Sequence, residues 1–211
     1  MSRGAESASA KESRSAGPAS AEIPLFPLNT VLFPGGPLPL RIFEPRYVDM
    51  VKYCMRERAP FGVVLIRAGA ESGKVTSAAE VGTSARIVDF SQLPDGLLGI
   101  SCVGEYKFRV HSRRVREDGL HMGTVLWMPA EPAVDLPGEY AHLGQLLRKV
   151  LPQLGDIYQS IPKHFDDAGW VSARLAEILP IDLADKQLCL EADDPIERLA
   201  RLSPFIRRAE D

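Results

Sequence analysis

The string GAESGKVT at residues 69–76 is the part of the sequence that comes nearest to a nucleotide-binding loop. Such a loop reads G-x-x-x-x-G-K-[ST], because its backbone amides cradle phosphate and its hydroxyl binds magnesium. Here only three residues separate Gly69 from Gly73, and Val75 stands where the hydroxyl is needed. The string also lies between expected strands instead of at the start of a long helix. The pattern therefore favours a solvated hairpin loop over a phosphate site.

No other residues form a pattern typical of catalysis or metal binding. The histidines stand in separate expected elements, without HExxH or Cys/His ligand spacing, at His111, His121, His142 and His164. The sequence contains no G-x-S-x-G nucleophile elbow. The acidic pair Asp193-Asp194 is better explained as a helix cap, and Asp166-Asp167 as a solvated loop. We therefore expect no catalytic residues, no metal, no cofactor and no enzyme activity.

One cluster of basic residues supports a different function. Residues 105–118 carry the side chains of Arg109, His111, Arg113, Arg114 and Arg116. Tyr106 and Phe108 alternate there with Lys107, which predicts a strand with one buried and one wet face. A basic strand can follow the phosphates of RNA. It can equally be an exposed sheet edge that charge keeps soluble. The net charge of −3 and the lack of aromatic residues on the basic face favour the second interpretation.

Length and composition are those of an ordinary globular protein. The 211 residues are 45% hydrophobic and 25% charged, which is enough to build one large or two small domains. The three cysteines, Cys54, Cys102 and Cys189, are far apart and odd in number, so they favour a reducing compartment over a disulfide framework. No apolar run is long enough for a membrane span or a secretory signal. We expect a cytoplasmic protein that does not bind membranes.

The residues before 130 predict a disordered tail followed by a β-rich domain. Residues 1–21 are almost all serine, alanine, glycine and charge, a composition typical of disorder. Residues 22–129 show mostly period-two patterns, with strands expected at 61–68, 83–90, 97–103, 105–118 and 120–128. One helix is expected to begin at Pro45, because proline suits the first helical position and apolar residues follow at helical spacing.

The period changes after a proline-rich linker at residues 130–136. Residues 137–211 show helical spacing instead, beginning with an apolar stripe from Tyr140 to Leu151. Further helices are expected at 171–179, after a cap at Asp182, and from Asp194 onward, where an acidic cap precedes a proline. The chain is thus predicted to place a helical domain after the β-rich one.

Four stretches carry a resemblance to a known family. They read IPLFPLNTVLFPGGPLPLRIFEPRYVDMV (23–51), PFGVVLI (60–66), EVGTSARIVDFSQLPDGLLGISCVGEYKFRV (80–110) and LAEILPIDLADKQLCLEADDPIERLARL (175–202). In this order and spacing, the chain resembles the amino-terminal substrate-binding domain of Lon proteases, to which a domain of cereblon is related. The resemblance covers nearly everything after residue 21.

The resemblance implies a fold and a function. The fold is α+β, with a PUA-like antiparallel β-barrel or pseudo-barrel that contains one short helix and is followed by a small helical bundle. The implied function is a free-standing, non-enzymatic module, without the ATPase and protease parts of Lon, that recognises exposed apolar or unfolded protein segments. Such a module is expected to act as an adaptor or regulator of proteolysis with a protease or chaperone partner. PUA-like barrels also occur in RNA-binding proteins, so RNA binding stays the alternative; client and oligomeric state are left open.

The stretch LFPGGPLPLRIFEPRYVDMV (32–51) is both stiff and apolar. Its prolines favour an edge or crossing strand whose path is rigid before any partner arrives. A preformed groove limits the entropy that a docking peptide loses, and ligand sites favour domain junctions. The candidate peptide-binding residues are therefore Phe33, Leu38, Trp127 and Met128. Packing in the core is the competing interpretation of these side chains.

Overall fold

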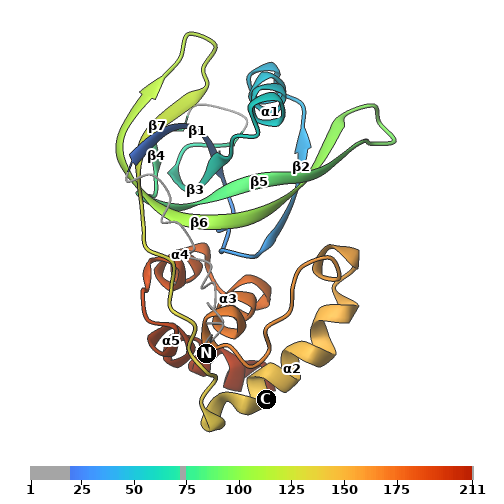
Figure 1. The fold of residues 1–211 in the computed structure, drawn as a ribbon, viewed down its shortest axis with the longest axis vertical. Helices are drawn as coiled ribbons and strands as arrows, with labels where there is room; N and C mark the ends of the chain where they lie inside the picture. The colour runs from blue at the N-terminus through green and yellow to red at the C-terminus, as the bar shows by residue number, and fades with distance from the viewer. Residues whose placement is uncertain (1–19, 72–74, 211) are drawn as a thin grey trace, which may run out of the picture.

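The computed structural model describes residues 20–71 and 75–210, which form a lobe of strands and a lobe of helices (Figure 1). The strands are β1 (Ser20–Leu28), β2 (Pro37–Ile42), β3 (Phe61–Ala68), β4 (Ser77–Ala78), β5 (Val81–Gln92), β6 (Leu98–Val115) and β7 (His121–Trp127). The expected disorder of residues 1–19 lies outside the described residues. Ser20 and Ala21 belong to β1, so this strand includes the last two residues of the expected tail.

The strand lobe is a closed ring. Strands that are hydrogen-bonded neighbours follow the order β1, β7, β6, β5 and β3, and β3 pairs with β1 to close the ring. The β1–β3 pair is parallel and the other pairs of the ring are antiparallel. The interior is filled by Ile23, Leu25, Val64, Phe108 and Val125. This closed arrangement confirms the predicted α+β fold with a barrel-like ring of strands. Closure also leaves the strands of the ring few open edges.

The long strand β6 replaces two strands that the sequence predicted separately, at 97–103 and 105–118. Its first half pairs with β5 and with the edge strand β2, forming a three-stranded arm, and its second half pairs with β5 and β7. The expected alternation is wrong near its middle, where Lys107 is only 4% exposed and Tyr106 is 50% exposed. The β5–β6 register shifts between Thr83 and Ala85, opposite this point, and such a bulge re-aims side chains.

The helix α1 (Pro45–Glu57) begins with proline in its first turn, as predicted, and lies against the barrel and the arm. Its buried residues are Tyr47, Met50, Val51 and Cys54, at helical spacing. Burial raises the pKa of the Cys54 thiol to about 11 and that of Cys102, in the same core cluster, to about 12. Both thiols therefore stay protonated near neutral pH, which makes them poor nucleophiles.

The Pro34-Gly35-Gly36 turn lies so close to β6 that side chains would not fit. The Gly35 amide donates to the Gly104 carbonyl at 2.8 Å, and the Gly104 amide donates to the Gly36 carbonyl at 2.9 Å. Gly35 has a φ of 72°, which favours glycine. A Cβ on Gly104 would lie 2.3 Å from the Phe33 carbonyl oxygen. The glycines therefore allow two backbones to approach each other directly.

The helical lobe follows the linker. It contains η1 (Gly138–Tyr140), α2 (Ala141–Val150), η2 (Leu151–Gln153), η3 (Asp156–Tyr158), α3 (Ala168–Ile178), α4 (Leu183–Glu191) and α5 (Pro195–Glu210). Asp194 accepts a hydrogen bond from the Ile196 amide, as expected for a cap. Asp182 stands at the N-cap of α4 without a side-chain cap bond. Asp167, which the sequence placed in a solvated loop, caps α3 through the Trp170 amide at 2.7 Å.

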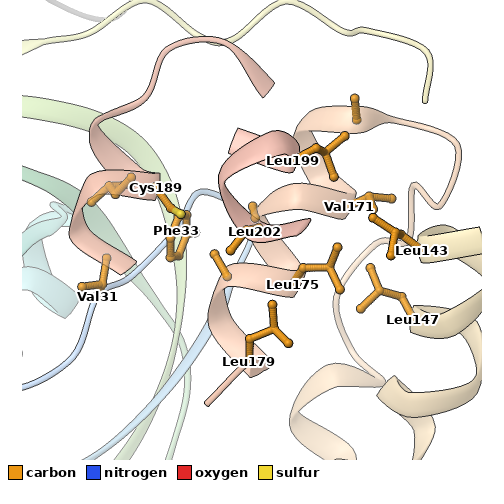
Figure 2. Close-up of a cluster of buried hydrophobic side chains, with 14 of the residues drawn as sticks. Val31, Phe33, Leu143, Leu147, Val171, Leu175, Leu179, Cys189, Leu199 and Leu202 are labelled. Carbon is orange, nitrogen blue, oxygen red and sulfur yellow. The ribbon is translucent and has the colours of Figure 1, made fainter. Parts of the chain in front are cut away.

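One hydrophobic cluster joins the two lobes (Figure 2). Helical residues supply most of it, among them Leu143, Leu147, Val171, Leu175, Leu199 and Leu202. Val31 and Phe33, from the segment between β1 and β2, enter the same cluster from the strand lobe. The apolar part of the 32–51 stretch therefore serves in part to fasten the lobes together.

Candidate functional site

The four candidate peptide-binding residues do not form an exposed groove. Phe33 is 0% exposed and Leu38 is buried beneath α1, so neither offers surface to a peptide in this conformation. Trp127 is half-buried and stands edge-on to Phe108, with ring centroids 6.1 Å apart. Met128 packs against the core of the helical lobe. Phe33 and Leu38 thus fill space inside the fold in this structure, and their contact with a peptide stays a prediction.

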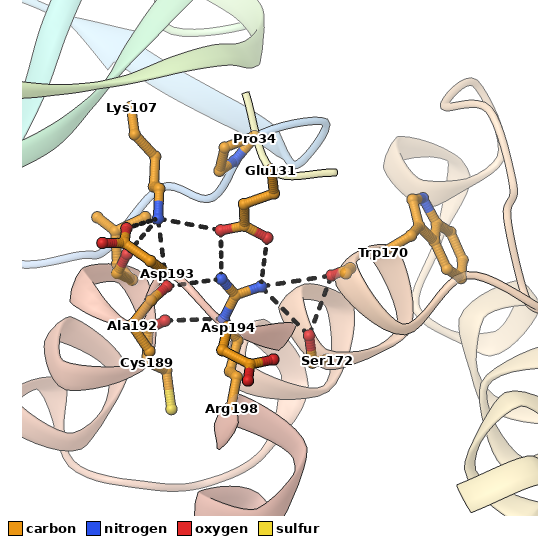
Figure 3. A network of polar contacts seen from close by, with 12 residues as sticks. Pro34, Lys107, Glu131, Trp170, Ser172, Cys189, Ala192, Asp193, Asp194 and Arg198 are labelled. Atoms are coloured by element: carbon orange, nitrogen blue, oxygen red, sulfur yellow. Dashed lines mark hydrogen bonds and ion pairs between the residues drawn. The ribbon is translucent and has the colours of Figure 1, made fainter. Parts of the chain in front are cut away.

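The junction between the lobes is closed by buried charge instead of being an open apolar groove (Figure 3). The Lys107 ammonium reaches from β6 into the helical lobe and donates to the carbonyls of Leu190 and Ala192 at 3.3 and 3.2 Å. It also lies 3.0 Å from the Glu131 carboxylate and 3.2 Å from that of Asp193. A buried ammonium needs such partners, because an unpaired charge in the interior is strongly unfavourable.

Arg198 of α5 completes this network from the helical side. Its guanidinium pairs with both carboxylate oxygens of Glu131, in the linker, and donates to the Ser172 hydroxyl at 3.2 Å. It also donates to the carbonyls of Cys189 and Ala192 at 2.8 and 3.0 Å. Glu131 thus binds a cation from each lobe, and we name Lys107, Glu131 and Arg198 the junction triad. Sequence reasoning missed it, since Lys107 was assigned to a wet face.

A second buried ion pair holds the Pro34-Gly35-Gly36 turn. Arg174 of α3 forms two hydrogen bonds to the Glu177 carboxylate, at 2.7 and 2.6 Å, and donates to the Pro34 carbonyl at 3.0 Å. Burial raises the pKa of the Glu177 carboxyl, and the Arg174 charge opposes this shift. A Cβ on Gly36 would lie 2.0 Å from a Glu177 carboxylate oxygen. These charges have a structural role, since they dock the strand lobe on α3.

The residues of the RNA-binding alternative are largely engaged within the protein. Arg114 pairs with Glu22 at 2.8 Å, Arg116 with Asp118 at 3.0 Å, and Arg109 lies 3.8 Å from Glu80. Arg113 donates to the carbonyls of Ala78 and Ala79, and His111 is exposed. Four of these five side chains thus have an acidic or carbonyl partner within the protein, and nothing in the geometry favours RNA binding.

One cavity of the described residues is a groove between α1 and the hairpin that joins β6 to β7. The two hairpins of the strand lobe lie on either side of α1 in Figure 1, and the groove is on the β6–β7 side. Its volume is about 460 Å³. Its apolar lining consists of Pro24, Met50, Tyr53, Leu120 and Met122, and its charged lining of Arg46, Asp49, Lys52, Arg56, Arg116 and Asp118. A second cavity, of about 400 Å³, lies in the helical lobe beside Tyr158 and Lys163.

One end of this groove, which we name the α1 groove, is held in place by Arg46. The Arg46 guanidinium donates to the Gly119 carbonyl in the hairpin at 3.0 Å, pairs with Glu44 at 2.7 Å and lies 4.8 Å from the centre of the Tyr47 ring. These contacts connect the two walls, so the groove is largely preformed. Tyr53, 45% exposed, stands on the α1 wall and offers an aromatic surface to a ligand.

The described residues contain no cluster of three or more His, Cys, Asp or Glu side chains placed to hold a metal ion. The lining of the α1 groove contains no Ser, Thr, Cys or His side chain and consists of apolar side chains, Tyr53, arginines, a lysine and two aspartates. Such a lining can bind a ligand through apolar contacts and charge. Among the helices of residues 20–71 and 75–210, none combines the length and apolar character needed to cross a membrane.

Comparison with known proteins assigns the family. Residues 22–208 match the family model described as the ATP-dependent protease La (LON) substrate-binding domain. The chain belongs to the Lon substrate-binding domain family. A solved structure, the Lon N-terminal domain protein from Xanthomonas campestris, is 38% identical, with a TM-score of 0.73 over 87% of this chain and 98% of that one. The N-terminal domain of Mycobacterium avium complex Lon protease, 18% identical with a TM-score of 0.65, shares the fold.

Relatives with full-length sequences are larger proteins. Lon protease of Escherichia coli K12 is 25% identical over 193 residues, which are 86% of this chain and 24% of the protease. Protein cereblon of Danio rerio is 34% identical over 111 residues, 51% of this chain and 25% of cereblon. This Lon-domain chain thus spans about a quarter of the length of these relatives. The resemblance to Lon and to cereblon that the sequence carries is confirmed.

Proposed function

We propose that this Lon-family module binds exposed apolar or unfolded segments of other proteins. The observation that carries the proposal is the α1 groove, an open site lined by both apolar and charged side chains and held in shape by Arg46. Its volume lies in the range of ligand-binding pockets. Tyr53 and Met122 suit varied partners, because aromatic rings offer broad contact area and methionine adapts its shape. Membership of a substrate-binding family supports the same function.

We further propose that the module acts as an adaptor or regulator of proteolysis, passing its clients to a protease or chaperone partner. Its three cysteines are free and buried, which supports a reducing, cytoplasmic setting. Affinity capture from cells, followed by mass spectrometry with and without nuclease, tests both points. Recovery of a protease or chaperone in the nuclease-treated sample is expected. Recovery of nucleic-acid-binding proteins alone, lost with nuclease, would contradict the adaptor role.

Binding without catalysis is the first expected result. The purified protein should hydrolyse neither ATP nor an unfolded polypeptide, because the lining of the α1 groove contains no Ser, Thr, Cys or His side chain and the sequence contains no phosphate-binding loop. Phosphate release and cleavage of a fluorescent protein substrate measure the two activities. Turnover that co-purifies with the chain and disappears on one point substitution would refute the non-enzymatic role.

The second expected result concerns the α1 groove. Tyr53→Ser should weaken binding to a reduced and carbamidomethylated test protein about tenfold, since a lost aromatic contact is worth about 1.4 kcal/mol. Affinity for an apolar segment without charged residues should change less than about threefold between low and high salt, because apolar burial is not screened as charge pairing is. Fluorescence anisotropy across a salt series measures both effects.

Phe90→Ser is the matched control for this experiment. Phe90 is also an exposed aromatic residue, 57% exposed, but it lies on β5, in the arm on the other side of α1. We expect the Phe90→Ser variant to bind the test protein as the parent does. Circular dichroism first checks that both variants are folded. Loss of binding in Phe90→Ser alone would move the client site to the arm. Failure of the parent protein to bind any unfolded chain would contradict client recognition itself.

A further inference from the structure

The charged lining of the α1 groove is unequal in sign. Four basic side chains, Arg46, Lys52, Arg56 and Arg116, face two acidic ones, Asp49 and Asp118. The whole chain has a formal net charge of −3, so the excess of basic over acidic side chains in this lining is opposite in sign to the net charge of the protein. Arg116 stands on the hairpin wall and the other three basic residues on the α1 wall. Each of these basic groups has a carboxylate partner within the protein, so its charge becomes available to a ligand only where such a pair opens.

The intramolecular partners of these basic groups can be displaced at little cost. Lys52 pairs with Asp49 and Arg116 with Asp118, both at 3.0 Å, and Arg56 pairs with Glu57 at 2.7 Å. All six of these side chains are exposed, and exposed ion pairs contribute little to stability. A carboxylate on a bound ligand can therefore compete for Lys52, Arg56 and Arg116 without disturbing the fold.

The size of the groove limits which class of ligand can place a carboxylate there. About 460 Å³ holds one large apolar side chain and its neighbours in the chain, and is too small for a folded domain. In an extended peptide the residues rise about 3.3 Å each, so the side chains that flank an anchored residue reach the rim. A groove lined by apolar side chains and exposed basic ones therefore matches an apolar anchor with acidic neighbours.

We propose that the α1 groove selects apolar protein segments flanked by aspartate or glutamate. This inference rests on the proposed function and names the class of client that the groove favours. Arg46, fixed by Gly119 and Glu44, keeps the groove in shape, while the exposed Arg56 and Arg116 read the flanking charge. A polyphosphate fits the site less well, because it has no apolar group to place against Pro24, Met50, Leu120 and Met122.

The test uses three fluorescent peptides with one apolar core, flanked by glutamate, glutamine or lysine. At low salt the glutamate peptide should bind about five- to tenfold more tightly than the glutamine peptide, and the lysine peptide most weakly. High salt should bring the three affinities together while leaving that of the glutamine peptide nearly unchanged. The double variant Arg56→Gln, Arg116→Gln should lose most of the preference, since only Lys52 remains of the exposed basic groups, and should keep the affinity for the glutamine peptide.

Arg86→Gln is the matched control, because Arg86 is equally exposed and paired, with Glu105, but lies on β5 outside the groove. It should keep the preference for glutamate. Equal binding of the glutamate and glutamine peptides by the parent protein would overturn this inference and leave the proposed function standing. Failure of all three peptides to bind would overturn the proposed function as well. Displacement of the glutamate peptide by a short RNA at equal or lower concentration would show a polyanion site instead.

Discussion

Replacing Phe33 with alanine is expected to lower the free energy of unfolding by about 3–5 kcal/mol, the range typical of a buried phenylalanine. The ring has no exposed surface and joins the cluster through which the strand lobe contacts the helical lobe (Figure 2). Alanine would leave a cavity that the surrounding helices fill only in part. Urea denaturation followed by circular dichroism measures the change.

Phe43→Ala is the control for this substitution. Phe43 belongs to the same proline-rich stretch but is 58% exposed, so its replacement should change stability by less than about 0.5 kcal/mol. Equal losses in the two variants would show that Phe33 is not a core residue. A Phe33→Ala protein as stable as the parent but unable to bind an unfolded chain would restore Phe33 as a peptide contact.

The other large effect is expected at the junction triad. Arg198→Met should destabilise the protein by about 3 kcal/mol, since removing one partner of a buried ion pair leaves the other uncompensated. The loss falls at the lower end of the usual range because Lys107 still neutralises Glu131, at 3.0 Å. The Ser172 hydroxyl and the Cys189 and Ala192 carbonyls lose a donor at the same time. Urea unfolding again gives the free energy.

Arg201→Met provides the comparison on the same helix. Arg201 lies one turn further along α5 and forms an exposed pair with Glu197, so its loss should leave the free energy of unfolding nearly unchanged. Introducing the same methionine separates the effect of the buried charge from that of the helix propensity. A drop of similar size in both variants would mean that the junction triad does not hold the lobes together.

Local patterns predicted much of the fold. Proline followed by apolar residues at helical spacing predicted α1, and the change of period near residue 130 matches the change from strands to helices. These features depend on residues close together in the sequence, where backbone sterics and side-chain periodicity act directly. The family resemblance came from the same local stretches. The α1 groove was not predicted, because it is formed by residues as far apart as Met50 and Met122.

The sequence by itself determined the class of fold, the family and the absence of recognisable catalytic motifs. Only the tertiary structure decided which residues are buried at the junction and which remain available to a ligand. Lys107 shows the reason, since its alternation with Phe108 indicated a wet face, yet its partner Ala192 lies 85 residues away. Periodicity reports the two faces of one strand but not what will later pack on them. The docking of the helical lobe therefore turned an expected surface lysine into a buried one, closed the expected groove at Phe33, and left the α1 groove open.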